Sequence, residues 1–282
     1  RQMCIRDSIK STRKITSALE MVAASKIKKT QEQMLRGRPY SEKVKDVIGH
    51  IANSSSEYDH PFYQEREAKT VCYGIVSSDK GLCGGLNTNL FKKVLVEAAA
   101  NKEQGVEVSF ALIGGKAVTF FGNLGGKILS QVTKMGDKPN PEDLIGFTKV
   151  ILDEQKKNSI DKVILCSNRF VNTMTQEPTL QQLIPLVNEA NEGLSAGQWD
   201  YIYEPEAKTL LDGLLTRYIE ALIFQAVLEN GACEQAAKMI AMKNATENAG
   251  DLIKELELLY NNVRQAAITQ ELSEIVGGAA AV

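Results

Sequence analysis

Histidines and paired cysteines are scarce in this chain of 282 residues. The two histidines, His50 and His60, fall near the end of an expected helix and in a polar stretch, so neither belongs to a recognisable nucleophile–base arrangement. The cysteines are odd in number, widely spaced and free of any CxxC motif: Cys4, Cys72, Cys83, Cys166 and Cys233. These absences argue against a metal site and are typical of a protein in a reducing compartment.

Long apolar runs and a strong net charge are missing as well. No window approaches the roughly twenty apolar residues that span a bilayer, and no secretory signal is recognisable. The net charge is −2, which gives no overall attraction to nucleic acid. Residues 1–45, however, carry twelve Lys or Arg against four Asp or Glu. We therefore expect a soluble chain with one basic end, able to dock on a membrane complex.

Proline is absent after Pro205, and the stretch that follows, 206–276, predicts one very long helix. In its clearest part, apolar residues follow at steps of four and three, the pattern of a heptad seam: Leu252, Leu256, Leu259, Val263 and Ala266. At 1.5 Å per residue the helix is roughly 100 Å long. A helix of this length has to pack against another helix or project from the body.

The N-terminal segment, about 8–52, is helical in character as well. An apolar stripe at helical spacing runs along it: Ile15, Leu19 and Val22. Proline removes a backbone donor and clashes with the preceding turn, so Gly37–Pro39 predicts a kink or break. The serine-rich run at 53–56 predicts the end of the helix.

The basic residues of this segment lack the interleaved aromatic side chains that nucleic-acid surfaces use. We interpret them as a surface that faces solvent or an acidic protein partner: Lys10, Arg13, Lys14, Lys26, Lys28 and Lys29.

Between the two helical ends, short buried strands alternate with helices. Continuous apolar runs rich in β-branched residues predict strands at 71–77, 106–113 and 162–167, with a last strand at 199–205. Helices are expected at about 86–102 and 141–157, and turns at 125–126 and 135–141. This alternation predicts a Rossmann-like, mainly parallel α/β domain.

The expected architecture is an α/β fold with a long antiparallel coiled coil formed by the two terminal helices. The divisions are an N-terminal helix (1–56), a central Rossmann-like domain (69–204) and a long C-terminal helix (205–282). Because the N-terminal helix is the shorter one, part of the C-terminal helix needs another partner or stays bare.

The most conspicuous local motif is SSDKGLCGGLN, residues 77–87, which lies between a strand and a helix. A glycine-rich loop in this position can cradle a phosphate with its backbone N–H groups. It matches neither GxGxxG nor GxxxxGK[ST], so a structural turn or a subunit contact is the preferred interpretation. Cys83 within it could be a nucleophile, but no histidine context supports that role.

The C-terminal end, 268–282, changes from a charged helix to a small, uncharged apolar tip. One interpretation is a frayed terminus. The other is a low-friction bearing inside a ring of other subunits, since small apolar side chains carry no polar group to desolvate.

Three segments, in this order, resemble the gamma subunit of F-type ATP synthases, and the resemblance spans about 8–282. They are KSTRKITSALEMVAASK (10–26), SSDKGLCGGLN (77–87) and ITQELSEIVGGAAAV (268–282). The resemblance implies a non-catalytic rotor shaft without cofactors. Its implied partners are a ring of three alpha and three beta subunits, an epsilon subunit and a membrane-embedded c-ring. Proton flow would turn the shaft and thereby drive ATP synthesis on the beta subunits.

The resemblance also implies which residues meet other subunits. For contact between shaft and beta subunits these are Lys14, Leu19, Val22, Lys26, Lys238, Gln265, Thr269 and Glu271. For the foot, the α/β domain, they are Asp79, Lys80, Gly81, Cys83 and Gly84. None is expected to be catalytic.

Residues 1–7 depart from the family pattern and are given no functional weight. Without a transit sequence or a cysteine-bearing insertion, we expect a bacterial protein, peripheral to the cytoplasmic face of the inner membrane. Two alternatives remain open. One is a static coiled-coil scaffold with a ligand-binding α/β domain, and the other is an enzyme that uses Ser77, Asp79, Lys80 or Cys83.

Overall fold

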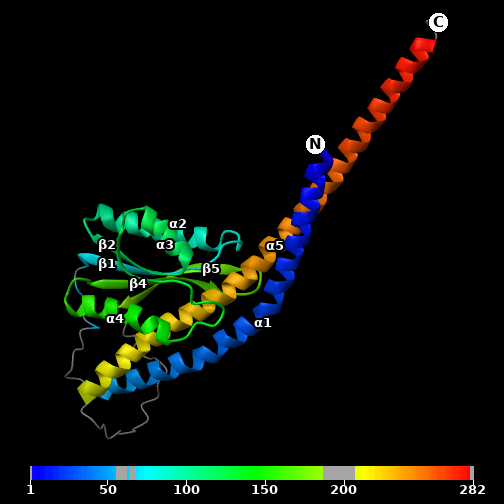
Figure 1. Cartoon of the computed structure of the whole chain (residues 1–282). Coiled ribbons are helices and arrows are strands. Elements are labelled where there is room, and N and C mark those ends of the chain that lie inside the picture. The colour runs from blue at the N-terminus through cyan, green and yellow to red at the C-terminus, as the bar shows by residue number, and fades with distance from the viewer. Residues whose placement is uncertain (1, 55–61, 64–65, 67, 187–206, 280–282) are drawn as a thin grey trace. The chain divides into compact units, whose positions relative to one another are not determined.

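A computed structural model describes residues 2–54, 62–63, 66, 68–186 and 207–279. The elements in chain order are α1 (Gln2–Ser54), β1 (Thr70–Val76), α2 (Leu86–Glu103), β2 (Glu107–Ile113), α3 (Gly115–Asn123), β3 (Lys127–Val132), α4 (Glu142–Lys156), β4 (Lys162–Phe170), β5 (Gln176–Ile184) and α5 (Ala207–Ala279) (Figure 1). The strand expected at 199–205 lies outside the described residues.

The chain divides into two compact units. The helical unit consists of Arg1–Ser25 and Lys238–Val282, and the α/β unit consists of Lys26–Ala237. Helices α1 and α5 each contribute a segment to both units. Within the described residues, no helix combines the length and the hydropathy needed to cross a membrane.

The α/β unit contains a five-stranded sheet with the strand order β3-β2-β1-β4-β5. Neighbouring strands from β3 to β4 are parallel, and β5 runs antiparallel to β4 at the edge. The Rossmann-like, mainly parallel sheet that the alternating pattern predicts is therefore confirmed. The helices expected at 86–102 and 141–157 are α2 and α4, with nearly the same bounds.

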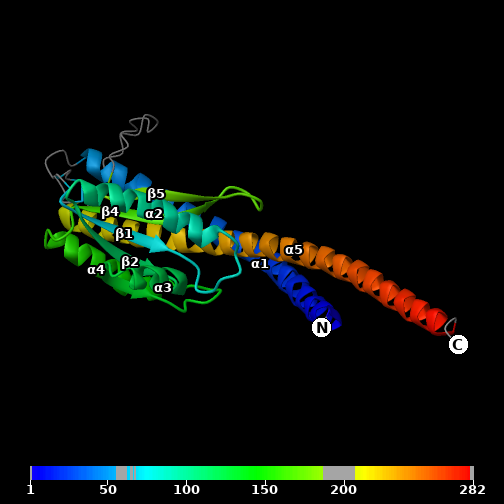
Figure 2. The ribbon, with the colours of Figure 1, turned by 90° about the horizontal axis from the view of Figure 1, so that it is seen from above.

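Both faces of the sheet are covered by helices. Helices α2 and α3 pack on one face, and α4 and the first part of α5 pack on the other (Figures 1 and 2). In β1, Cys72 joins the core under α4 and α5, while its neighbour Tyr73 joins the core under α2 and α3. Because side chains alternate along a strand, both faces need apolar residues, which explains the uninterrupted apolar runs.

Three elements of this unit escaped the sequence pattern. Helix α3 has nine residues and is bounded by glycines, so its apolar period is too short to stand out. Strands β3 and β5 lie at the two edges of the sheet, where all of their side chains except those of Leu183 and Ile184 are half-buried or exposed. These two strands show neither a continuous apolar run nor strict alternation, because few of their side chains are fully buried.

Helix α1 continues through Pro39, so a break there is wrong. A proline inside a helix costs about 3 kcal/mol, but tertiary packing can offset such a cost. Just before it, Gly37 lies directly against the side chains of Gln225 and Leu228 of α5. The helix ends at Ser54, within the serine-rich run that predicts its end.

In the helical unit, the N-terminal part of α1 lies antiparallel to the later part of α5. Thr246 donates a hydrogen bond to Thr16 at 2.8 Å between the hydroxyl oxygens, and Lys10 pairs with Glu257 at 3.3 Å. Helix α5 extends beyond the N-terminus of α1 (Figures 1 and 2). The predicted antiparallel pairing of the terminal helices is thus confirmed.

The helix faces that meet differ from those that the apolar stripes predict. On α5 the buried positions of this unit are Met242, Ala249 and Ile253, whereas Leu252, Leu259 and Val263 are exposed. On α1 Ala23 is buried, whereas Ile15 and Val22 are exposed. The seam combines the small residues Ala23 and Ala249, which allow a close approach of the helices, with the larger Met242 and Ile253. Other residues of the predicted stripes, such as Ile15 and Leu259, are exposed.

Candidate functional site

The glycine-rich loop 77–87 joins β1 to α2, and its first residues bind the N-terminus of α3. Three successive N–H groups of α3 bond to the loop: Gly115 to Oδ1 of Asp79 at 2.9 Å, Lys116 to the carbonyl of Ser78 at 3.1 Å, and Ala117 to Oγ of Ser77 at 2.9 Å. These are the groups with which a helix N-terminus binds an anion. The loop itself therefore satisfies them, which leaves α3 no open phosphate site.

Inside the loop, the side chain of Asn87 likewise satisfies polar groups by hydrogen bonds. Its Oδ1 accepts from the N–H of Ser78 at 3.2 Å, and its Nδ2 donates to Oγ of Ser78 at 2.7 Å and to Sγ of Cys83 at 3.3 Å. Asn87 and Ser78 are both buried. Since the polar groups satisfy one another, the arrangement supports the structural interpretation of the loop over the phosphate-binding one.

Gly114, just before α3, shows how close this packing is. Its φ is +94°, a conformation that side-chain-bearing residues rarely adopt, and a Cβ there would collide with the carbonyl of Ser77. The close approach brings the loop within hydrogen-bond distance of α3.

The expected foot residues divide between interior and surface. Asp79 also accepts from the N–H of Lys134 at 3.1 Å, which ties the loop to the chain after β3. Cys83 is buried and packs with Leu86 and with Cys233 of α5. Lys80 and Gly84 are exposed, and Gly81 is half-buried. Contact of these residues with another subunit stays a prediction.

A second set of contacts joins the end of β4 to α5. Asn168 Nδ2 donates to Oδ1 of Asn230 at 2.9 Å, and both side chains are buried. The N–H of Phe170 donates to Oε1 of Glu229 at 3.0 Å, and Sγ of Cys233 donates to the carbonyl of Asn168 at 3.4 Å. Burial raises the pKa of the Cys233 thiol, and the nearby Glu229 carboxylate adds to the shift, so the thiol keeps its proton.

These contacts lie at the place where doubly wound sheets usually bind ligands. The strand order reverses between β1 and β4, and ligands bind outside the carboxyl ends of the strands at such a switch point. Here Ser78, after β1, is bonded to Asn87, and Asn168, near the end of β4, is bonded to Asn230. The chain's own side chains thus occupy the polar groups of this crevice.

Sequence reasoning missed the contacts of Asn168 and Asn230. A signal was present, because three of the four residues at helical spacing from Asn230 are apolar or small, namely Ala226, Val227 and Cys233. A buried amide among such neighbours needs a partner. Its partner is 62 positions earlier in the chain and on another element, so the sequence alone could not name it.

The expected shaft residues lie mostly on the surface. Within the helical unit Lys14, Val22, Gln265, Thr269 and Glu271 are exposed, and Leu19 and Lys238 are half-buried. In the α/β unit Lys26 pairs with Asp137 of the loop after β3, with 2.7 Å between Nζ and Oδ2. This pair is largely exposed, so it contributes little to stability.

The last part of α5 carries large apolar side chains in water. Every residue from Asn261 to Ala279 is exposed, and Leu272, Ile275 and Val276 keep 57%, 67% and 67% of their accessible surface. Apolar patches of this kind mark surfaces that another molecule covers. The side chains are compatible with the bearing interpretation of the C-terminal tip.

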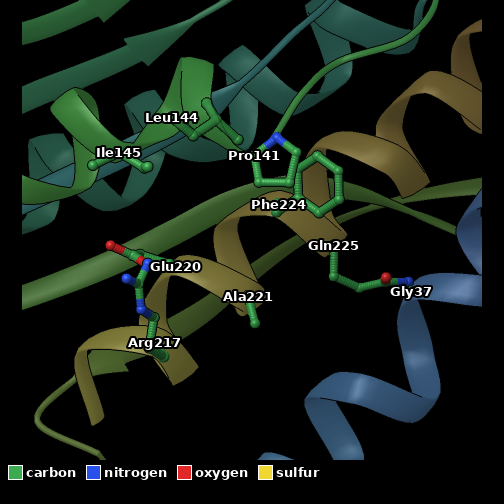
Figure 3. Close-up of a pocket in the computed structure, with 9 residues that line it drawn as sticks. All are labelled: Gly37, Pro141, Leu144, Ile145, Arg217, Glu220, Ala221, Phe224 and Gln225. Atoms are coloured by element: carbon green, nitrogen blue, oxygen red, sulfur yellow. The ribbon is translucent and has the colours of Figure 1, made fainter. Parts of the chain in front are cut away.

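One pocket in the α/β unit, of about 330 Å³, lies among α1, α4 and α5 (Figure 3). Its walls are mainly apolar, with Leu144, Ile145 and Phe224 among the lining residues. Its two charged groups bind each other, with 2.7 Å between Nη1 of Arg217 and Oε2 of Glu220. An apolar gap between three packed helices accounts for both the shape and the lining of the pocket.

The described residues contain no cluster of three or more His, Cys, Asp or Glu side chains able to hold a metal ion.

An α/β unit that binds its own long helix, and a helix whose last part carries exposed apolar side chains, together indicate a subunit of a larger assembly. A family model described as ATP synthase matches residues 6–282. The chain belongs to this family, the gamma subunits of F-type ATP synthases.

Solved structures share the fold. The chain is 21% identical to a chain of the central stalk and c-ring of the mitochondrial ATP synthase of Tetrahymena thermophila, with a TM-score of 0.63 over 82% of this chain and 99% of that one. A chain from the mitochondrial ATP synthase of Euglena gracilis, in its OSCP/F1/c-ring part, is 17% identical, with a TM-score of 0.59 over 94% and 95% of the two chains. At such identities the likeness establishes the fold.

Proposed function

We propose that this chain is the non-catalytic central rotor shaft of an ATP synthase. In this role it couples proton flow through the membrane sector to ATP synthesis or hydrolysis on the beta subunits. Its partners are a ring of alpha and beta subunits around the helical unit, and an epsilon subunit and a c-ring at the α/β unit. The chain is then peripheral to the membrane through the complex.

A single observation carries this proposal, and it concerns α5. The first part of this helix belongs to the core of the α/β unit, where Leu215, Ile219 and Ile223 are at most 1% exposed. The last part, Asn261–Ala279, is exposed throughout. One continuous helix therefore joins a folded base to an apolar surface that needs a partner, as a shaft in a sleeve requires.

Coupling follows from asymmetry. A partner shifts a conformational equilibrium only by its differential affinity for the two states. A shaft made of two unlike helices presents a different surface to each beta subunit, so each site holds a different nucleotide affinity. Rotation then moves every site through these states in turn, without any chemistry on the shaft.

The exposed residues of the helical unit supply contacts for this role. We propose that Lys14 and the basic face of α1 approach acidic beta segments. Leu19 and Val22 add apolar contact, and Gln265, Thr269 and Glu271 act near the tip. Lys26, the first residue of the α/β unit, and Lys238, the first α5 residue of the helical unit, complete the proposed set.

Reconstitution tests the proposal directly. The purified chain is mixed with the alpha and beta subunits of an F-type ATP synthase, and complex formation and ATP hydrolysis are measured. A stoichiometric complex with ATPase activity is expected, and the chain alone is expected to hydrolyse no ATP. Failure of folded components to assemble would contradict the shaft. Turnover by the isolated chain would favour an enzyme.

Rotation separates a shaft from a static scaffold. A probe attached to the α/β unit of the surface-bound complex is followed by microscopy during ATP hydrolysis. We expect unidirectional turning with pauses set by the beta subunits. A complex that hydrolyses ATP while the probe stays fixed would support the scaffold instead.

The C-terminal tip is tested by removing Ile268–Val282. Because the described part of this segment is exposed, the α/β unit should keep its thermal unfolding temperature, while assembly or coupling is impaired. Val96→Gln is the matched control, since Val96 is an exposed apolar residue of the α/β unit. It should leave assembly and coupling intact.

A further inference from the structure

The attachment of α5 to the sheet has an apolar part and a polar part. The apolar part consists of α5 side chains buried against the core under α4, among them Leu215, Ile219, Ile223 and Val227. The polar part, which we name the β4–α5 clamp, consists of Asn168, Phe170, Glu229, Asn230 and Cys233.

The two parts restrain the helix in different ways. Hydrophobic burial has no direction, so it opposes separation of the helix from the sheet more than rolling or sliding along it. Hydrogen bonds need particular distances and angles. The clamp joins side chains within one turn of α5 to a side chain, an N–H group and a carbonyl of β4, with donor–acceptor distances from 2.9 to 3.4 Å.

Burial makes the clamp sensitive to small movements of the helix. Asn168 is 1% exposed, Asn230 3% and Cys233 0%. If α5 rolled or slid, these polar groups would lose their partners in a place where water cannot replace them. A buried polar pair of this kind is best known for fixing the register of packed helices.

A second contact supports the clamp from the other side of the crevice. Cys83 and Leu86 of the loop region pack with Cys233 in one small buried cluster, which Phe170 borders. The same loop is held by Asp79 to the N–H groups of Gly115 and Lys134. The residues around Cys233 are thereby tied to α3 and to the chain after β3.

We propose that the β4–α5 clamp is the torque-bearing attachment between the helix and the α/β unit. It fixes the rotation and register of α5 on the sheet, while the apolar contacts supply most of the stability. This inference rests on the proposed rotor function and adds to it the side chains that prevent slip. Asn168, Asn230 and Glu229 are positioning residues in this account.

The decisive variant replaces the buried amides by apolar residues of similar size, Asn168→Leu with Asn230→Leu. Such a replacement removes the buried amide–amide bond of the clamp and keeps its other two hydrogen bonds. It leaves no unpaired polar atom in either side chain, so the fold should persist. The chain is assembled into ATP synthase in liposomes, and proton pumping is measured per ATP hydrolysed. The loss of one hydrogen bond that fixes the register permits a roughly fivefold larger population of molecules in which α5 has rolled or slid on the sheet. In these molecules rotation is not transmitted, so we expect fewer protons to be pumped per ATP hydrolysed.

Ile219→Val is the matched control within the apolar attachment, because it removes one buried methylene and no hydrogen bond. It should leave the ratio unchanged. Equal ratios for wild type and the double Leu variant would overturn the proposal. Failure of the wild-type chain to assemble or pump would instead count against the rotor function.

A second pair of variants applies even if the double Leu variant fails to fold. Glu229→Met removes the acceptor of the Phe170 N–H, whereas Glu229→Gln keeps an oxygen there. We expect Glu229→Met to speed hydrogen exchange at Phe170 and lower the pumping ratio, and Glu229→Gln to do neither. Faster exchange at Phe170 without a lower ratio would show that the contact carries no torque.

Discussion

The two parts of α5 face opposite environments although they belong to one helix. In the α/β unit its buried side chains between Leu215 and Cys233 join the hydrophobic core and the β4–α5 clamp. In the helical unit the described residues from Asn261 onward are all exposed. Apolar residues occur in both parts, so composition does not distinguish them. The chain therefore buries the first part against its own sheet, while the last part stays exposed and, in the proposed role, is the surface for a partner.

A matched pair of isoleucine substitutions should show the largest difference between the two parts. Ile219→Ala removes a side chain that is 0% exposed, and we expect a loss of about 3 kcal/mol in the free energy of unfolding of the α/β unit. Ile275→Ala changes a side chain that is 67% exposed, and we expect a change below about 0.5 kcal/mol. Urea unfolding followed by circular dichroism measures both. Similar losses would mean that the isolated chain buries its tip.

Asp79→Ala should produce the next largest effect, because two backbone N–H groups lose their acceptor. We expect a loss of about 1.5 kcal/mol in the α/β unit and faster hydrogen exchange at Gly115. Asp79→Asn keeps an acceptor oxygen and should recover most of the loss. Equal effects of the two substitutions would show that the negative charge matters and the hydrogen bonds do not.

Alkaline pH should weaken the α/β unit through its buried thiols. Burial raises the pKa of Cys72 from 9.0 to about 12, an effect that a hydrogen bond with Ser109 partly opposes. The folded chain therefore keeps a proton that the unfolded chain releases. The contribution to stability is complete below pH 9 and is lost as the pH rises from about 9 towards 12.

The effect of this one thiol amounts to about 1 kcal/mol at pH 9.5 relative to pH 7.5. Cys72→Ala should abolish that share of the pH dependence, which denaturant titrations at both pH values can measure. Cys4→Ala serves as the control, since Cys4 is already exposed in the folded chain. An identical pH dependence in Cys72→Ala and wild type would contradict the assignment.

The smallest expected effect concerns the seam of the helical unit. Thr246→Val removes the hydroxyl that donates to Thr16 and leaves a side chain of the same shape. We expect a loss of about 0.5 kcal/mol, seen as faster hydrogen exchange in the N-terminal part of α1. Thr216→Val is the control, because the Thr216 hydroxyl bonds only within its own helix, to the carbonyl of Asp212, among the contacts that the structure describes.

By itself the sequence determined that the chain has a helical segment at each end, an alternating α/β region between them and the loop 77–87, although it did not show that the first helix continues through Pro39. These features depend on local periodicity, on prolines and glycines, and on apolar runs, all of which can be read from neighbouring residues. For the same reason the sequence already suggested that α5 is longer than α1 and that α1 can cover only part of it.

Only the tertiary structure decided which side chains meet. It turned Ala23, Ala249 and Ile253 inward and left Ile15 and Leu259 exposed. It also gave the loop its partners on α3 and joined Asn168 to Asn230. Periodicity marks the faces of a helix, but burial depends on the position of elements distant in the chain. In the folded chain, the loop 77–87, whose sequence resembles a ligand site, therefore binds the N-terminus of α3 instead.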